Sequence, residues 1–198
     1  MSHYFDLDEN VKSQEFSVKF DIQGKHFSFI SDNGVFSKDE LDDGSLTLIT
    51  SALKENLFGR VLDLGCGIGT VGIVLKSFID NIKVDFVDVN ERALNLTRKN
   101  IDNLKLDDCN VFYSDGYKNI TELYDYIITN PPIRAGKVVV YDFILNSFDH
   151  LKDNGVLLVV MRKSHGAPSA KKHLEEKFGN CEIVSRNKGF YILKSIKK

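Results

Sequence analysis

A glycine-rich turn follows the apolar run 61–64 and has the sequence Gly-Cys-Gly-Ile-Gly at residues 65–69. Glycines at alternate positions allow positive φ angles and let a bulky ligand approach the backbone closely. Residues 67–72 also satisfy the pattern G-x-G-x-x-G, which by itself is a weak signal for nicotinamide dinucleotides. Asp63 distinguishes this turn, because a carboxylate there suits a ligand with an ammonium group and would repel a pyrophosphate. We therefore expect a cofactor site at the turn.

One acidic residue ends the next apolar run, and another follows the run after it. Asp88 stands nineteen residues after Gly69, a spacing at which an acidic residue can accept hydrogen bonds from both ribose hydroxyls of an adenosine. A helix N-cap is the other interpretation of Asp88, although Asn90 can serve as that cap. Asp115 is placed to accept a hydrogen bond from an adenine amino group, but Asp-Gly is also a common turn signal.

The segment Asn130-Pro131-Pro132 follows a fourth apolar run. Two consecutive prolines fix an extended loop, which would hold the Asn130 side chain and the Pro131 carbonyl in place. Two such acceptors can bind both N–H donors of one exocyclic amine and direct its lone pair toward an incoming methyl group. A turn that only ends a strand is the alternative. We expect Asn130, Pro131 and Pro132 to be catalytic.

The elements that must position these residues alternate from residue 60 onward, which predicts an α/β fold with a mostly parallel sheet. Strands are expected at 61–64, 84–88, 109–113, 124–129, 156–161, 182–185 and 190–193, and helices at 45–57, 70–78, 91–103, 139–151 and 169–178. Ser45 is the expected N-cap of the first helix. Residues 186–189 are too few for a helical crossover, so the last two strands must form an antiparallel hairpin. Ligands of such sheets bind at the carboxyl ends of the strands, where every motif above falls.

The N-terminal segment has a different pattern. Phe16, Val18 and Phe20 alternate along one face, and Gln23-Gly24 separates them from a second apolar run, which predicts a β-hairpin. We expect residues 1–44 to form an N-terminal extension of hairpin and loop, and residues 45–198 to form the catalytic domain.

Composition narrows the class of protein. Hydrophobic residues make up 42% of the 198 residues and charged residues 27%, an ordinary globular balance. No apolar run approaches the roughly 18 residues of a membrane span, and residues 1–10 do not resemble a signal peptide. Three scattered cysteines do not fit a zinc site or a disulfide framework. We expect a cytoplasmic monomer that binds no membrane and no metal.

The net charge of −2 hides an asymmetry between the two ends. Residues 162–198 hold ten Lys and Arg against three Asp and Glu, a charge of +7, and the rest of the chain carries sixteen against twenty-five, a charge of −9. A basic end can bind nucleic acid. It can equally be a solvated helix and edge strand, and charge alone does not decide between the two.

Together these motifs resemble the class I S-adenosylmethionine-dependent methyltransferases over about residues 45–195. The resemblance implies a Rossmann-like, doubly wound, seven-stranded sheet with S-adenosyl-L-methionine as cofactor. It places the methionine end at the glycine turn, the ribose at the second strand and the adenine amine at the third. The cofactor-binding residues that it implies are Asp63, Gly65, Cys66, Gly67, Gly69, Asp88, Val89, Asp115, Gly116 and Asn130.

Four stretches, at residues 3–5, 34–45, 130–137 and 161–163, resemble more closely the guanine-N2 methyltransferases of small-subunit (16S) ribosomal RNA, the RsmC type. Asn-Pro-Pro marks the branch that methylates adenine N6, guanine N2 or glutamine N5. Ile133 stands where the adenine and glutamine enzymes usually have Tyr, Phe or Trp, which favours guanine N2. The chain resembles the catalytic half of the larger family members, which carry a second methyltransferase-like domain.

This resemblance implies ribosomal RNA, or the assembling small ribosomal subunit, as the partner. The target base must leave its stack, and Phe36, Tyr4 or Phe5 are candidates to stack on it. The residues expected to contact RNA are Phe36, Ile133, Arg134, Arg162 and Lys163, with Lys137 beside them. The alternatives are a glutamine-N5 methyltransferase of a release factor, a nicotinamide-dependent oxidoreductase, and a non-enzymatic RNA-binding module.

Overall fold

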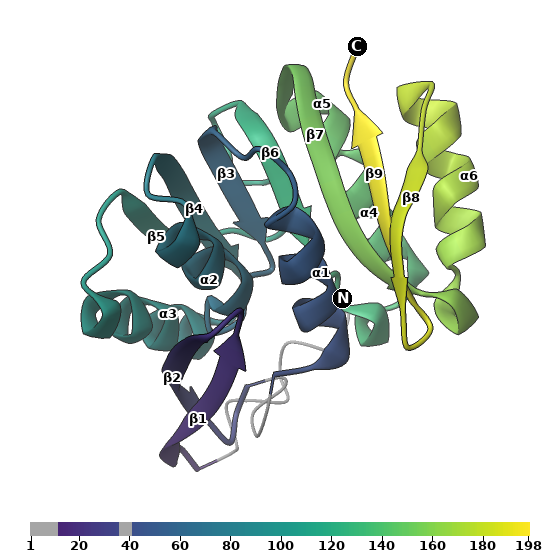
Figure 1. The fold of residues 1–198 in the computed structure, drawn as a ribbon. Coiled ribbons are helices and arrows are strands. Elements are labelled where there is room, and N and C mark those ends of the chain that lie inside the picture. Colours follow the sequence, from purple (N-terminus) through teal and green to yellow (C-terminus); the bar gives the residue numbers. More distant parts are fainter. Residues whose placement is uncertain (1–11, 36–40) are drawn as a thin grey trace.

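The computed structural model describes residues 12–35 and 41–198. These residues form two sheets (Figure 1): a seven-stranded sheet that lies between two layers of helices, and a separate two-stranded sheet. The strands are β1 (Glu15–Ile22), β2 (Lys25–Asp32), β3 (Gly59–Leu64), β4 (Ile82–Asp88), β5 (Cys109–Tyr113), β6 (Tyr124–Thr129), β7 (Leu151–Arg162), β8 (Glu182–Asn187) and β9 (Phe190–Ile196). The helices are α1 (Asp43–Ala52), α2 (Thr70–Phe78), α3 (Glu91–Leu104), α4 (Lys137–Leu145), α5 (Ser147–His150) and α6 (Ala167–Phe178), with short 3-10 turns η1 (Ile133–Ala135) and η2 (Lys163–His165).

The large sheet has the strand order β5-β4-β3-β6-β7-β9-β8. Neighbouring strands from β5 through β7 are parallel, whereas β9 is antiparallel to both β7 and β8. These findings confirm the predicted α/β class, the doubly wound order and the antiparallel C-terminal hairpin. Because the chain winds outward from β3 on one side and from β6 on the other, the switch point lies between these two strands.

The sheet separates two hydrophobic cores, as alternation along its strands requires. Val61, Tyr126 and Ile128 face one core together with residues of α1, α2 and α3. Leu62 and Ile127 face the other core together with residues of α4 and α6. The helices therefore cover both faces of the sheet, with α1 and α2 in front and α4 to α6 behind in Figure 1.

The predicted N-terminal hairpin is present as β1 and β2. Its two-residue turn has positive φ at both central positions, +47° at Gln23 and +80° at Gly24, the geometry that matches strand twist. Phe27 and Phe29 point inward and belong to the same core as α1, α2 and α3. The Asn100 side chain of α3 bonds to both backbone groups of Ile30 in β2. Its oxygen accepts from the Ile30 amide at 2.7 Å, and its nitrogen donates to the Ile30 carbonyl at 3.1 Å.

The first helix differs from its prediction at both ends. It begins at Asp43, because the Asp42 carboxylate accepts from the backbone amides of Gly44 and Ser45, each at 3.0 Å. Asp42 is thus the N-cap, and the assignment of Ser45 to that position is wrong. The helix ends at Ala52 rather than near residue 57. Directly after Ala52, i to i+3 hydrogen bonds replace the helical pattern and form turns.

The predicted helix 139–151 is instead two helices, α4 and α5, separated at Asn146. The Ser147 hydroxyl donates to the Ile144 carbonyl at 2.6 Å, so a side chain competes there with the helical ladder. Leu151 already belongs to β7, where it pairs with Tyr124 of β6. The strand predicted at 156–161 is therefore longer, and it runs from Leu151 to Arg162.

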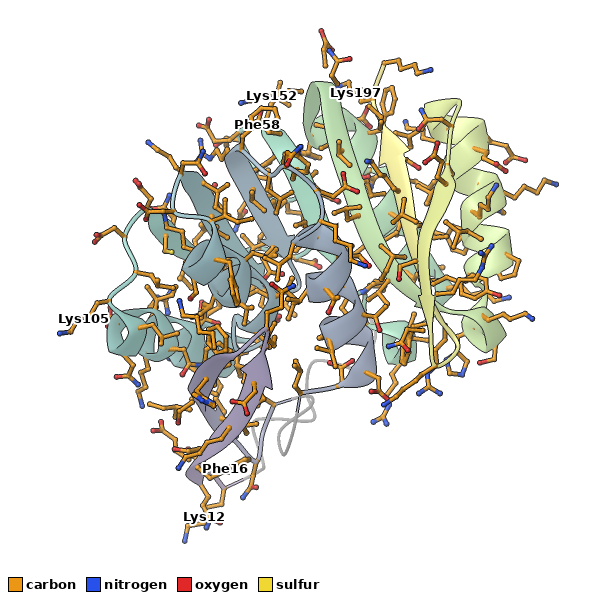
Figure 2. The ribbon with its side chains drawn as sticks, in the orientation of Figure 1. Lys12, Phe16, Phe58, Lys105, Lys152 and Lys197 are labelled. Carbon is orange, nitrogen blue, oxygen red and sulfur yellow. The ribbon has the colours of Figure 1, made fainter. Side chains whose placement is uncertain are left out.

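The carboxyl ends of β3, β4, β5, β6 and β7 lie on the side of the molecule that carries the hairpin. Figure 2 shows Phe58 and Lys152, near the amino ends of β3 and β7, at the opposite end from Phe16 of the hairpin. Within the described residues, none of the helices has the length and apolar composition needed to cross a membrane. The predicted motifs thus converge on one edge of the sheet, beside the hairpin and the start of α1.

Candidate active site at the carboxyl ends of the strands

The glycine turn joins β3 to α2, and its backbone is left-handed at each predicted glycine. The φ angle is +70° at Gly65, +57° at Gly67 and +83° at Gly69. A Cβ at Gly69 would lie 2.8 Å from the Thr97 side chain, whereas one at Gly67 would meet no described atom within 4 Å. The turn is therefore tightly packed at Gly69 and open at Gly67. The open position fits a ligand that approaches the backbone there.

Asp63 lies just before this turn and is buried, with 3% of its surface exposed. Its carboxylate accepts a hydrogen bond from the Gly72 amide at 2.8 Å. Burial and, to a smaller extent, the nearby Asp88 carboxylate raise the pKa of Asp63 to about 7, although the hydrogen bond from Gly72 acts to lower it. A cation beside Asp63 would offset that unfavourable charge, so the predicted ammonium contact fits the electrostatics of the site.

Cys66 is also among the residues predicted at the cofactor. It is buried, and its Sγ lies 3.6 Å from the Gly67 carbonyl and 3.9 Å from the Thr97 hydroxyl. Burial raises the pKa of the Cys66 thiol well above its ordinary value. The side chain is therefore a neutral packing group in the turn.

Asp88 ends β4, as predicted, and braces the glycine turn. One carboxylate oxygen accepts from the Gly67 amide and the other from the Asn90 amide, both at 2.9 Å. The side chain of Asn90, not that of Asp88, caps α3 by accepting from the amides of Arg92 and Ala93. A carboxylate has about four acceptor positions, so these two bonds are compatible with the predicted contact to ribose hydroxyls. Val89, the next residue, is half-buried.

The third acidic residue, Asp115, lies beyond β5 and is half-exposed, paired with Lys118 at 2.5 Å. The neighbouring Ser114 amide donates to the Asp88 carbonyl at 3.1 Å, which places this segment beside the end of β4. The buried Ser114 hydroxyl donates to the Gly116 carbonyl at 2.7 Å and holds the turn. Lys118 contacts Oδ2 of Asp115, so an adenine amino group would use another acceptor position of this carboxylate.

Asn130 leaves β6 directly beside the glycine turn, because Thr129 pairs with Leu64 of β3. The Thr129 hydroxyl donates to the Leu64 carbonyl at 2.8 Å and ties the two strand ends together. The half-buried Asn130 side chain donates through Nδ2 to the Ser45 hydroxyl of α1 at 3.1 Å. Pro131 is buried. The loop is thus held at a defined position, with an amide and a backbone carbonyl near the glycine turn.

The residues predicted to contact RNA lie in two places. Ile133 is half-buried against the core of α4 and α6, and Arg134 is exposed beside it. Arg162 and Lys163 are exposed at the end of β7, where the Arg162 guanidinium lies 4.6 Å from the Phe190 ring. They border a cavity of about 460 Å³ whose lining residues are Arg162, Lys163, Ser164, Lys188 and Gly189. Phe36, Tyr4 and Phe5 lie outside the described residues.

Three polar residues at the site were not predicted as functional. Besides Ser45, these are Thr97, whose hydroxyl donates to the Gly67 carbonyl at 2.8 Å, and Asn100, whose amide donates to the Ile68 carbonyl at 3.1 Å. Both lie on the otherwise apolar face of α3 and are fully buried. Polar residues within an apolar helical stripe are the signal that could have revealed them.

The methyltransferase small domain family matches residues 26–194 of this chain, and so includes nearly all of the described structure. The chain belongs to this family. Membership confirms the prediction that the chain is a class I, S-adenosylmethionine-dependent methyltransferase. It also removes the alternative of a nicotinamide-dependent oxidoreductase.

Individual members of the family agree with this assignment. The chain is 41% identical over 197 residues to the Uncharacterized protein YbxB of Bacillus subtilis, and the match covers 98% of both chains. It is 34% identical over 168 residues to Ribosomal RNA small subunit methyltransferase C of Erwinia tasmaniensis, covering 83% of this chain and 48% of that protein.

Among solved structures, the chain is similar to the 16S rRNA N2 G1207 methyltransferase (RsmC) of T. thermophilus in complex with AdoMet and guanosine. The TM-score is 0.82 at 26% identity, and the match covers 94% of this chain and 51% of that one. The chain therefore spans about half the length of its RsmC relatives.

Proposed function

We propose that this methyltransferase transfers a methyl group from S-adenosylmethionine to the exocyclic N2 amine of a guanosine in ribosomal RNA. The favoured substrate is 16S RNA. The observation that carries the proposal is the Asn130-Pro131-Pro132 loop, which leaves β6 directly beside the glycine turn of β3. This arrangement brings two hydrogen-bond acceptors for an amine next to the turn that would hold the methyl donor.

The residues around the glycine turn fit the cofactor. S-adenosylmethionine supplies an electrophilic methyl group on a sulfonium centre. Asp63 would face the ammonium group, Asp88 the ribose hydroxyls and Asp115 the adenine amine, while open space at Gly67 admits the ligand to the backbone. The Asp63 carboxylate, whose pKa burial raises, gains most from a neighbouring positive charge.

Asn130 and Pro131 would act on the acceptor. Guanine N2 is a weak nucleophile because its lone pair is delocalised into the ring. If Asn130 Oδ1 and the Pro131 carbonyl each accept one N–H hydrogen, the lone pair is directed outward toward the methyl group. The donor would leave as S-adenosylhomocysteine, which keeps the electron pair of the broken S–C bond, and the acceptor nitrogen would carry a positive charge until it releases one proton to water. Both acceptors stabilise that developing charge, and the rigid loop supplies the alignment.

The contacts with RNA would lie around the cavity at the end of β7. Its exposed cationic side chains, Arg162 and Lys163, suit phosphates of the strand that carries the target. The base must leave its stack to reach Asn130, with Ile133 and Arg134 beside the loop. Guanosine and AdoMet in the T. thermophilus RsmC structure, and the RNA named for the RsmC relatives, support this substrate class.

The decisive experiment offers tritiated S-adenosylmethionine together with 16S RNA, 23S RNA, assembled small subunits and a release factor. Labelled RNA that yields N2-methylguanosine by mass spectrometry of its nucleosides supports the proposal. Label in glutamine of the release factor would replace it with glutamine-N5 methylation, and N6-methyladenosine would replace guanine as the acceptor.

A variant tests the assigned chemistry directly. Asn130→Ala should lower turnover by about 10²–10³-fold, the usual loss for one charge-stabilising group, while S-adenosylmethionine still binds. The matched control is Asn146→Ala, an exposed asparagine between α4 and α5. Turnover in Asn130→Ala equal to that of the control would remove Asn130 from the mechanism.

A further inference from the structure

The first turn of α1 carries a hydroxyl that contacts the Asn130 loop. Ser45 is buried, with 7% of its surface exposed, and its Oγ accepts a hydrogen bond from Asn130 Nδ2 at 3.1 Å. The two residues are 85 positions apart in the chain. The contact joins α1, which holds none of the predicted cofactor-binding residues, to the side chain that would hold the methyl acceptor.

Ser45 is itself held firmly. The Asp42 carboxylate accepts from the Ser45 backbone amide at 3.0 Å, and Gly44 at the start of α1 lies beside Phe190 of β9. A Cβ at Gly44 would lie 2.9 Å from the Asp42 carboxylate and 3.0 Å from the Phe190 ring. The start of α1 therefore has little room to shift, and the Ser45 hydroxyl is a fixed reference point for the loop.

The Asn130 carboxamide needs such a reference. The terminal torsion of asparagine is broad and nearly two-fold, so exchange of its oxygen and nitrogen costs little without a partner. Only one orientation presents Oδ1 to the N–H of an exocyclic amine, while the other presents an NH2 donor to a donor. In the structure Ser45 Oγ is bonded to Nδ2, and this contact holds the carboxamide in the orientation that leaves Oδ1 available to the methyl acceptor.

We propose that Ser45 is a positioning residue that orients the Asn130 carboxamide for methyl transfer, an inference that rests on the proposed function of Asn130. Ser45 does not touch the reacting atoms, and it acts through Asn130 alone. Its loss should therefore change the rate of methyl transfer and leave the glycine turn and cofactor binding unaltered.

Kinetics of four variants test the proposal: Ser45→Ala, Ser45→Thr, Asn130→Ala and the double variant. Ser45→Ala should lower kcat about tenfold, the size of one neutral hydrogen bond, with the Kd for S-adenosylmethionine unchanged. Ser45→Thr keeps the hydroxyl and should restore most of the rate. In the Asn130→Ala background, Ser45→Ala should have no further effect, because the group that it orients is absent.

Ser51→Ala is the matched control. Ser51 lies on the same helix and is also 7% exposed, but it is six residues further along, and it should keep wild-type turnover. Wild-type turnover in Ser45→Ala would overturn the proposal. So would a tenfold loss that persists in the Asn130→Ala background, because that result would mean a general structural defect.

A measurement without RNA separates this proposal from the proposed function. The side-chain NH2 resonances of Asn130 in a ¹⁵N spectrum are assigned by their loss in Asn130→Ala. They should shift in Ser45→Ala and stay in place in Ser51→Ala. Unchanged resonances in Ser45→Ala overturn the role of Ser45, whereas failure of the wild-type protein to methylate RNA overturns only the substrate.

Discussion

At the scale of single residues, we expect the buried Asp63 carboxyl to make the stability of the protein depend on pH. Its pKa of about 7 in the folded chain stands well above the ordinary value of 3.8, so between these values the folded state holds a proton that the unfolded state has lost. The stabilisation from this proton is complete below about pH 4 and is lost as the pH rises through 7. Asp63→Asn should therefore raise the Tm at pH 8 more than at pH 5, as thermal unfolding at the two pH values can measure.

Binding of S-adenosylmethionine should have the opposite pH dependence. An ammonium group prefers ionised Asp63, so the affinity of the wild-type protein should rise by up to about tenfold per pH unit below 7 and then level off. Calorimetric titration between pH 5.5 and 7.5 measures this slope, and Asp63→Asn should flatten it. An equally steep slope in the variant would assign the titration to another group.

The residues also show what a local pattern can reveal. Asp63, Asp88 and Asn130 were found from spacing because each stands at or next to the carboxyl end of a strand, and the structure brings all three to one edge of the sheet. Ser45 was found but given the wrong role, since Asp42 supplies the N-cap. Its contact with Asn130 spans 85 positions, and no periodicity within one segment encodes such a distance.

At the scale of elements, α3 joins the hairpin to the cofactor turn through one amide. Asn100 bonds both backbone groups of Ile30 and the carbonyl of Ile68, and it is fully buried. Asn100→Leu leaves these three groups without partners and should lower the free energy of unfolding by about 3 kcal/mol. The affinity for S-adenosylmethionine should also fall, because the glycine turn loses a support.

Urea unfolding and calorimetric titration of Asn100→Leu provide the measurement. Asn103→Leu is the control, since Asn103 is exposed on the same helix and should cost little. Equal unfolding free energies for the two variants would show that the hydrogen bonds of the Asn100 side chain contribute nothing to stability.

Elements were predictable where periodicity was strong and local. The strands and their antiparallel end followed from short apolar runs and from the four residues 186–189, which are too few for a helical crossover. The start of α1 and the break at Asn146 did not, because they depend on hydrogen bonds of the Asp42 and Ser147 side chains. Those bonds compete with the helical ladder by small energies that composition does not reveal.

At the scale of the whole molecule, the structure divides the basic C-terminal segment into two groups. Lys171 and Lys172 on α6 are paired with Glu175 and Glu176, which is the arrangement of a solvated helix face. Arg162 and Lys163 border the cavity at the end of β7, and within the described residues no carboxylate lies within ion-pair distance of either one. The net charge of +7 thus overstates what is available to RNA.

This division predicts which charges control binding of RNA. Each phosphate contact adds about 0.7–0.9 to the slope of log affinity against log salt, so the double variant Arg162→Ala, Lys163→Ala should lower that slope by about 1.4–1.8. The double variant Lys171→Ala, Lys172→Ala removes the same charge from a surface already neutralised by Glu175 and Glu176, and its slope should match that of the wild-type protein. Filter binding of 16S RNA between 50 and 300 mM salt, roughly the range where counterion release dominates, measures both. Equal losses in the two variants would mean that RNA senses only net charge, and the cavity at the end of β7 would lose its assigned role.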